Sequence, residues 1–191
     1  MRVIAALGLA LMLTVSGLAQ TTTSSTYFDG GSVVDSAGNL YVFDYGRSTT
    51  GVTITGLRHS FYAPKTRITV QRAGTGNTQT VEYDGSLRVI GVGNGAVYAV
   101  ATAFTVSGTT LTTADSLIAI KSTLPAGPAL SGFASFSLTS GIDARVGPSD
   151  YISLVTEPDR SPSSTTTTAR TAKVLHFNGT AFEVVSSGTL P

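Results

Sequence analysis

Three related apolar segments recur along the chain, and they constrain its fold more than any other feature. The segments are Gly38–Asp44, Gly95–Ala101 and Ser149–Val155. Each begins with turn-forming residues and continues into a short run of β-branched, aromatic and other apolar side chains, as at a junction between a turn and a strand. Their starts lie about 55 residues apart, a spacing typical of a repeated supersecondary unit. The sequence therefore predicts three copies of one structural unit.

No window of the chain shows a sustained helical spacing of apolar residues, whereas short β-branched runs bounded by Gly, Asn, Asp and Pro recur from end to end. An all-β fold is predicted, with one strand before each related segment and two strands after it. The predicted strands are Gly31–Asp35, Leu40–Asp44, Arg67–Arg72, Thr78–Tyr83, Leu87–Val92, Val97–Phe104, Ser116–Lys121, Phe133–Thr139, Ile142–Val146, Tyr151–Thr156, Ala172–Phe177 and Thr180–Val185.

Turn residues separate these runs. Asn178-Gly179 and Asp84-Gly85 both suit type I′ hairpin turns, in which two central residues have positive φ. The glycine-rich stretch Val89–Ala96 is predicted to be another turn, because the β-prone residues after it do not open the helix that a dinucleotide-binding loop needs. Pro64 and the later prolines are predicted to fall between strands, since proline donates no hydrogen bond to a sheet.

The first of the three segments resembles a known repeat. Residues Val34–Asp44 read V-D-S-A-G-N-L-Y-V-F-D, which is similar to the V-D-x-x-G-N-L-Y-V-x-D signature of NHL-type and related six-bladed β-propeller repeats. Asp35, Gly38 and Asn39 occupy the matching turn positions. The later copies depart from this signature, so the resemblance covers one motif and the period. It implies that each unit is a propeller blade, a four-stranded antiparallel meander.

Three blades leave the architecture open, because closed propellers use roughly four to eight. The fold class expected is all-β, with about three four-stranded antiparallel blade-like meanders that form a partial propeller. Two chains could complete a six-bladed ring as a homodimer, and the chain could be a piece of a longer product. A β-sandwich of two packed sheets is the alternative fold, since alternating strands also build that architecture.

The N-terminus has the features of a secretory signal peptide: Arg2, the apolar run Ile4–Leu13 and small residues up to Ala19. Cleavage after Ala19 would place the mature chain in the periplasm or outside a bacterial cell. The apolar run is shorter than the ~20 residues that span a bilayer, and no membrane span is expected. The predicted divisions are 1–19 signal peptide, 20–29 flexible N-terminal segment and 30–191 single β-repeat domain.

Composition narrows the function further. The 12 Lys and Arg residues nearly balance 11 Asp and Glu, so nothing favours a nucleic-acid partner. Two histidines, no cysteine and no nucleophile motif leave no catalytic residue, metal site or cofactor to nominate. The aspartates mostly stand at predicted strand ends, where their side chains typically bond to nearby backbone N–H groups.

Binding is expected on the connections between the second and third strands of each unit, which emerge together in a meander. These connections are predicted to be long loops over Tyr45–Thr66, Thr105–Asp115 and Glu157–Thr171, and long loops on a rigid scaffold are common recognition sites. The candidate binding residues are Arg47, Arg58, His59, Tyr62, Lys65, Arg160 and Arg170.

The function favoured by the sequence is that of an exported, non-enzymatic binding module for a protein or carbohydrate ligand. The family resemblance also allows a lactonase-like or sugar-acting propeller enzyme. A structural or adhesive surface protein is the third alternative, because repeated strands and low charge are typical of that class.

Overall fold

The computed structural model describes residues 21–54, 57–107, 110–124, 133–139, 142–156 and 170–190, which contain twelve strands in three four-stranded antiparallel sheets. The first sheet contains β1 (Thr21–Val34), β2 (Leu40–Ile54), β3 (Leu57–Gln71) and β4 (Thr78–Tyr83). The second contains β5 (Gly85–Val92), β6 (Ala96–Ser107), β7 (Thr110–Lys121) and β8 (Ala134–Leu138). The third contains β9 (Ile142–Val146), β10 (Tyr151–Thr156), β11 (Arg170–Phe177) and β12 (Phe182–Leu190).

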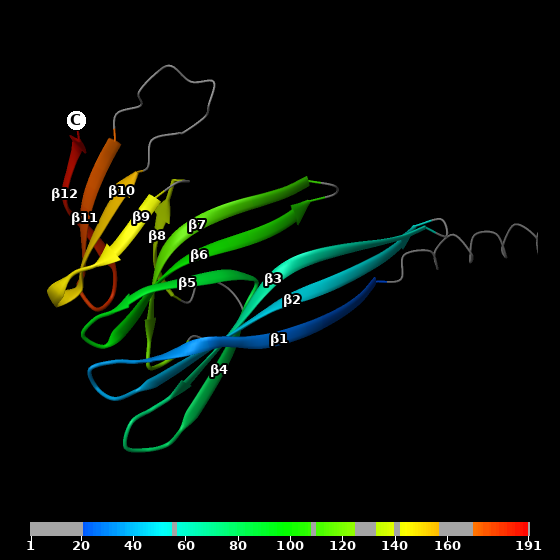
Figure 1. Ribbon diagram of the computed structural model, residues 1–191, viewed down its shortest axis with the longest axis horizontal. Helices are drawn as coiled ribbons and strands as arrows, with labels where there is room; N and C mark the ends of the chain where they lie inside the picture. The colour runs from blue at the N-terminus through cyan, green and yellow to red at the C-terminus, as the bar shows by residue number, and fades with distance from the viewer. Residues whose placement is uncertain are drawn as a thin grey trace, which may run out of the picture.

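The all-β prediction is confirmed, and each predicted strand overlaps one of the twelve observed strands. Every sheet is a meander of consecutive strands, and the three related segments supply the second strand of each: β2, β6 and β10. The sheets lie side by side as an open stack of blades, with no closed ring (Figure 1). Three separate sheets do not fit the alternative of a two-sheet sandwich. No helix in the described ranges is long and apolar enough to cross a bilayer.

The second sheet is covered on both faces. Along β6, Val97, Ala99 and Ala101 belong to the core shared with the first sheet, whereas Ala96 and Tyr98 belong to the core shared with the third. Successive side chains on a strand point to opposite faces, so a strand buried on both sides has a continuous apolar run instead of an alternating one. The uninterrupted apolar sequence of residues 96–101 follows from this position in the stack.

Two hydrophobic cores hold the stack together. The core between the first and second sheets includes Tyr41, Phe43, Ile68, Val70, Tyr83, Leu87, Ile118 and Ile120. The core between the second and third sheets includes Leu117, Ala144, Ile152, Leu154, Leu175 and Phe177. Burying one large aliphatic or aromatic side chain stabilises a fold by about 1.5–3 kcal/mol, so these cores supply most of the stabilisation between sheets.

The outward face of the first sheet is polar. Arg67 pairs with Asp44 at 2.8 Å, and its guanidinium lies 4.6 Å from the centre of the Tyr27 ring. Thr69 and Thr80 join their hydroxyls across neighbouring strands at 3.0 Å. The same strands therefore have one apolar face toward the second sheet and one face with ion pairs and hydroxyls toward solvent.

The β1–β2 turn explains the motif seen in the sequence. The Asp35 carboxylate, 5% exposed, accepts hydrogen bonds from the backbone N–H groups of Ala37 and Asn39, the Asn39 side chain and the Tyr41 hydroxyl, at 2.8–3.0 Å. Gly38 has a φ of 83°, which suits glycine. Burial alone would raise the pKa of Asp35, but these hydrogen bonds outweigh it and hold the pKa below its usual value.

In the second sheet, the buried tyrosine hydroxyl also bonds to an aspartate, but this aspartate comes from the third unit. Tyr41, Tyr98 and Ile152 occupy equivalent positions in the three units, and each is 0% exposed. The turn before Tyr98 has Val92 where the first unit has Asp35. Instead, the Tyr98 hydroxyl donates to Asp150, from the turn before β10, at 2.8 Å. Ile152 has no hydroxyl and needs no carboxylate.

Asp150 also fixes the neighbouring turn. Its Oδ1 accepts the backbone N–H of Asn94 at 2.8 Å, so one carboxylate oxygen joins the β5–β6 turn, β6 and the third sheet. A Cβ atom at Gly93 would lie 1.9 Å from that oxygen, which leaves room for glycine only. Burial, followed by the bond to Asp150, raises the pKa of Tyr98 well above its usual value.

Other contacts tie the first sheet to the second. The Thr66 hydroxyl, 0% exposed, donates to the Gly85 carbonyl at 3.0 Å. Arg72 donates to the Ser122 carbonyl at 3.1 Å. Gln79 both donates to the Leu124 carbonyl, at 3.2 Å, and accepts its N–H, at 2.9 Å. These hydrogen bonds supplement the apolar core, because they are directional and so fix the position of the first sheet relative to the second.

Two predicted turns differ in the structure. Asp84-Gly85 does not close a hairpin, because β4 ends at Tyr83 in the first sheet and β5 starts at Gly85 in the second. Asn178-Gly179 does connect a hairpin, but the loop extends to Ala181. Asn178 Oδ1 accepts the N–H groups of Thr180 and Ala181 at 2.9 Å, and within this turn Gly179 alone has a positive φ. A side-chain hydrogen bond thus replaces the expected type I′ geometry.

Strand pairing also extends beyond the predicted limits. Residues 21–29, expected to be flexible, form the first part of β1, with pairs from Thr21 opposite Val52 to Asp29 opposite Asp44. Pro64 lies inside β3 instead of between strands. The pairing of β3 with β4 stops at Thr66, so on that side Pro64 has no neighbouring strand to which it should donate. The predicted signal peptide, residues 1–19, lies outside the described residues and stays a prediction.

Candidate functional site

The predicted binding loops are largely strands. Residues 45–54 and 57–66 continue β2 and β3 as a long hairpin, in which Arg47 is opposite Pro64 and Val52 is opposite His59. Residues 105–107 and 110–115 likewise extend β6 and β7. The prediction of long loops over 45–66 and 105–115 is therefore wrong, because backbone pairing with the neighbouring strand continues almost to the tip. Of the third loop, residues 157–169 lie outside the described residues.

The ends of these second and third strands nevertheless emerge on the same side of the stack, whereas the turns between first and second strands gather at the opposite side (Figure 1). This arrangement is the one expected for meanders of equal topology.

Lys65 is held by acidic neighbours. Its ammonium lies 2.8 Å from a Glu82 oxygen and 3.7 Å from an Asp84 oxygen. The hydrogen bond with Glu82 is the main reason that the pKa of Lys65 is raised and that of Glu82 is lowered. Both residues lie on the outward side of the first sheet, where such pairs contribute little to stability. Lys65 thus has an intramolecular role already.

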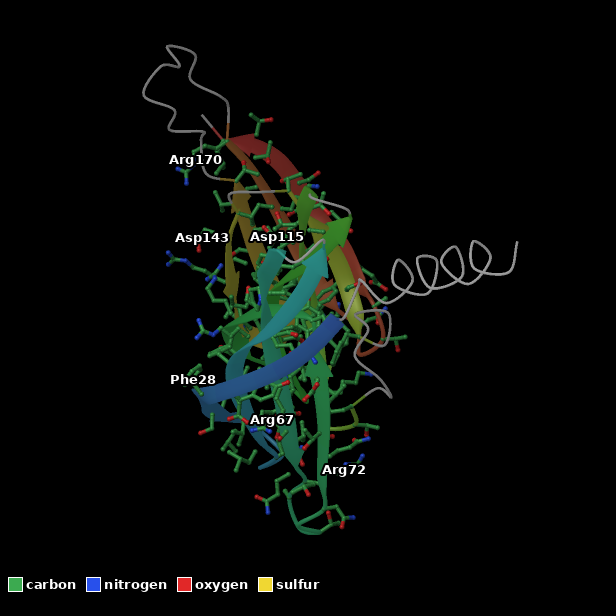
Figure 2. The ribbon with its side chains drawn as sticks, turned by 90° about the vertical axis from the view of Figure 1, so that its right-hand side faces the viewer. Phe28, Arg67, Arg72, Asp115, Asp143 and Arg170 are labelled. Carbon is green, nitrogen blue, oxygen red and sulfur yellow. The ribbon has the colours of Figure 1, made fainter. Side chains whose placement is uncertain are left out.

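The remaining predicted site residues are not gathered in one place. Arg58, His59 and Tyr62 lie along β3, opposite Thr53, Val52 and Thr49, and nothing is described of their side chains. Arg170 is the first residue of β11, in the third sheet, and is exposed. Figure 2 shows it at one end of the molecule, far from Arg67 on the first sheet. Arg160 lies outside the described residues, and the predicted set stays untested as a binding site.

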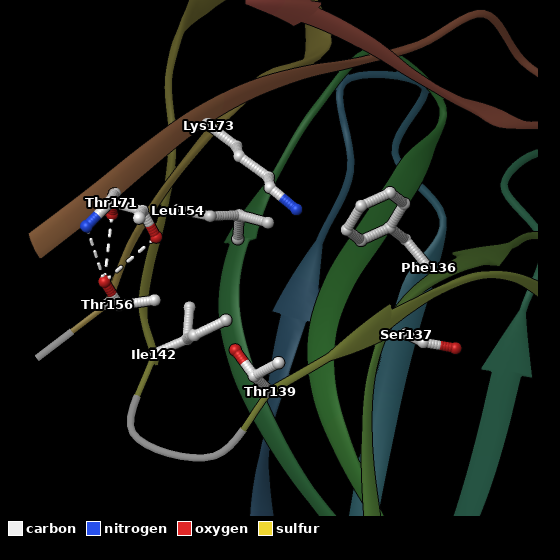
Figure 3. Close-up of a pocket in the computed structure, with 8 residues that line it drawn as sticks. All are labelled: Phe136, Ser137, Thr139, Ile142, Leu154, Thr156, Thr171 and Lys173. Carbon is white, nitrogen blue, oxygen red and sulfur yellow. Dashed lines mark hydrogen bonds between the residues drawn. The ribbon is translucent and has the colours of Figure 1, made fainter. Parts of the chain in front are cut away.

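A small cavity opens at the same side of the stack, between the second and third sheets (Figure 3). It has a volume of about 60 Å³. The residues that line it come from β8 and the residue after it, from the start of β9, and from β10 and β11: Phe136, Ser137, Thr139, Ile142, Leu154, Thr156, Thr171 and Lys173. Phe136, Ile142 and Leu154 make it apolar inside, and these three side chains also belong to or pack on the core between the sheets.

Lys173 supplies the positive charge of this cavity. Its register on β11 places it in phase with the buried Leu175 and Phe177, but Lys173 itself is exposed, so its side chain lies at the surface end of this face. The ammonium lies 5.8 Å from the centre of the Phe136 ring, within cation–π distance. Among the residues that the structure describes, no carboxylate comes within ion-pairing distance of this ammonium.

Hydroxyl groups line the wall formed by the end of β10 and the start of β11. Thr156 Oγ1 accepts the backbone N–H of Thr171 at 2.7 Å and lies 3.1 Å from the Thr171 hydroxyl and 3.2 Å from its carbonyl oxygen (Figure 3). This cluster closes the hairpin where β10 ends and β11 begins. Since Thr156 already has these partners, it stabilises the wall of the cavity and is not poised as a nucleophile.

The acidic residues of the described ranges are dispersed in structural roles. Asp35 and Asp150 serve turns and tyrosines, Asp44 and Asp143 pair with arginines, and Asp115 accepts the Thr102 hydroxyl at 2.7 Å. Within these ranges no three His, Cys, Asp or Glu side chains come together in a way that could hold a metal ion.

The cavity could not be predicted from the sequence, although one of its residues stands out there. Lys173 alternates with Leu175 and Phe177, so a charged residue falls on the apolar side of a predicted strand. The other contributors, Phe136, Ile142 and Leu154, resemble ordinary core positions in the sequence. These residues form a cavity only because segments that are distant in the sequence pack together between two sheets. A short stretch of sequence does not show this packing.

Comparison of the chain with models of protein families, with curated proteins and with solved structures finds no match.

Proposed function

We propose that this protein is an exported, non-enzymatic binding module that takes a small group into the cavity between its second and third sheets. The observation that carries the proposal is the cavity itself: an apolar interior with one lysine ammonium that lacks an acidic partner in the described structure. Ligand sites are typically apolar clefts with a few oriented polar groups. The signal-peptide pattern of residues 1–19 supports export.

The dispersed acidic residues favour binding over catalysis. Hydrolysis by a pair of carboxylates or by a metal ion requires several acidic side chains to face one substrate. Here Asp44 bonds to Arg67, Asp143 to Arg145, and Asp150 to Tyr98. The side chains that converge on the cavity are apolar groups, hydroxyls and a lysine.

The proposal can be tested with methyl-labelled protein that starts at Gln20. The probes are isobutyrate, isobutyramide and isobutylamine, which share a shape and differ in charge, together with γ-butyrolactone as a model lactone. We expect at least one of the first three to shift the methyl signals of Ile142 and Leu154 saturably in NMR spectra. The lactone should hydrolyse no faster than in buffer alone.

The variant Ile142→Phe provides a control, because the larger side chain fills a cavity of only about 60 Å³. It should abolish the saturable shift of Leu154 while the circular dichroism spectrum stays unchanged. Absence of any saturable shift in the unmodified protein would refute a binding role for the cavity. Accelerated loss of the lactone would instead favour the enzymatic alternative.

A further inference from the structure

We infer that the cavity between the second and third sheets selects a compact aliphatic carboxylate, either a free short-chain acid or the C-terminal residue of a partner chain. This inference rests on the proposed function and adds the chemical class of the ligand. It follows from three properties of the cavity: its size, its charge and the division between its apolar and polar walls.

Size sets the first limit. The volume of about 60 Å³ is far below the ~300–1,000 Å³ of pockets that enclose a whole drug-sized ligand. A nucleotide or an oligosaccharide is too large to be enclosed by such a space, whereas a branched group of a few carbons is of suitable size. The ligand group that enters is therefore small, even if the rest of the ligand stays outside.

Charge sets the second limit. Lys173 is the charged residue among those that line the cavity, and the described chain gives its ammonium an aromatic face at 5.8 Å but no carboxylate. A cationic ligand would be repelled, and a neutral one would leave the ammonium to water. An anion at the cavity mouth gains a charge-assisted hydrogen bond from this group.

The arrangement of the walls sets the third limit. Phe136, Ile142 and Leu154 offer no hydrogen bond to a ligand, so an anion that is polar on all sides, such as phosphate, would lose water against these side chains without compensation. A carboxylate attached to an aliphatic group meets both requirements. Its carbon atoms contact the apolar interior, and its oxygens stay near Lys173.

The test compares isobutyrate with isobutyramide, which has nearly the same shape and no charge. At low salt we expect isobutyrate to bind about fivefold more tightly, because one partly exposed ion pair is worth up to about 1 kcal/mol. The Lys173→Met variant keeps the length of the stem and should reduce the two affinities to within twofold of each other. The titration is followed through the methyl signals of Ile142 and Leu154.

Lys121 offers a matched control. Its ammonium also lies over a phenylalanine ring, 5.7 Å from the centre of Phe177, but it does not line the cavity. Lys121→Met should therefore keep the preference for isobutyrate. Loss of the preference in both variants would overturn the assignment to Lys173, because the effect would then reflect net charge alone.

Two further arms distinguish the sources of the carboxylate. N-acetylvaline carries the group that ends a polypeptide, and N-acetylvalinamide lacks the charge. Tighter binding of N-acetylvaline than of isobutyrate would support a partner's C-terminal residue, and weaker binding would support a free acid. If isobutyramide or isobutylamine binds as well as isobutyrate, the carboxylate inference is wrong while a binding cavity remains. If no probe binds, both proposals fail.

Discussion

The hydrogen bond between Tyr98 and Asp150 makes a quantitative prediction about the contact between the second and third sheets. Tyr98→Phe removes one hydroxyl and nothing else from a side chain that is 0% exposed. Asp150 Oδ1 loses its bond of 2.8 Å from that hydroxyl and keeps the bond from Asn94 N–H. A hydrogen bond to a charged group contributes about 1.5–3 kcal/mol, and Asp150 is partly exposed so that water can replace the lost donor. We expect the free energy of unfolding to fall by about 1.5 kcal/mol.

Tyr41→Phe is the matched control in the first sheet. Asp35 keeps three other donors from its own turn, with at least one for each carboxylate oxygen, so the loss should be smaller, about 1 kcal/mol. It should also remain local to the first sheet. Tyr98→Phe, in contrast, should accelerate amide hydrogen exchange in β9 and β10, because it weakens a contact between two sheets.

Urea unfolding followed by far-UV circular dichroism measures both losses, provided that the dependence on urea concentration is unchanged between variants. The cycle with Asp150→Asn should give a coupling energy of about 1 kcal/mol, since asparagine keeps an acceptor and removes the charge. A loss below about 0.5 kcal/mol for Tyr98→Phe, or coupling no larger than the usual ~0.3 kcal/mol of independent sites, would refute the role given to Asp150.

Three further predictions concern close approaches and acid stability. Gly93→Ala places a Cβ atom 1.9 Å from Asp150 Oδ1 and should destabilise the fold by about 2 kcal/mol in urea; an unchanged midpoint would contradict this geometry. Gly85→Ala places its Cβ 2.2 Å from the Thr102 carbonyl oxygen, a backbone atom, so thermal unfolding should show a loss of about 3 kcal/mol; a smaller loss than for Gly93→Ala would argue against this close approach of β5 to β6. Because hydrogen bonds lower the pKa of Asp35 from 3.8 in the folded state, its contribution is complete above that pH and is lost as the pH falls through the lower folded value. Asp35→Asn should thus destabilise the protein at pH 7 and differ less from the unmodified chain in acid, and a constant difference would be inconsistent.

The strands could be predicted from the sequence because each has a local signature. The β-branched runs, the bounding turn residues and the repeated segments starting at Gly38, Gly95 and Ser149 are all visible within short windows, and the structure places a strand at each. The continuous apolar run in β6 is likewise visible in the sequence, and it indicates a strand that is buried on both faces. Local pattern sufficed wherever one strand's own residues determine its burial.

What the sequence did not reveal depends on distant partners. Residues 45–54 and 57–66 contain Gly, Pro and Thr and have no clear alternation, yet they form strands through their pairing with each other. Asp84-Gly85 has the composition of a hairpin turn, but the next strand packs on another sheet. The carboxylate that serves Tyr98 comes from a residue 52 positions away. None of these three features can be predicted from a short stretch of sequence.

The burial of β6 on both faces limits how this chain can be divided. Among the described residues, each outer sheet packs its apolar surface on the middle sheet, and β6 of the middle sheet contributes to both cores. A fragment of one or two units would therefore expose part of an apolar core, and we expect the three units to unfold together. A substitution at Val97 must fit the packing against the first sheet, and one at Tyr98 must fit the packing against the third. We therefore expect β6 to tolerate fewer substitutions than β2 or β10, each of which packs on one neighbouring sheet.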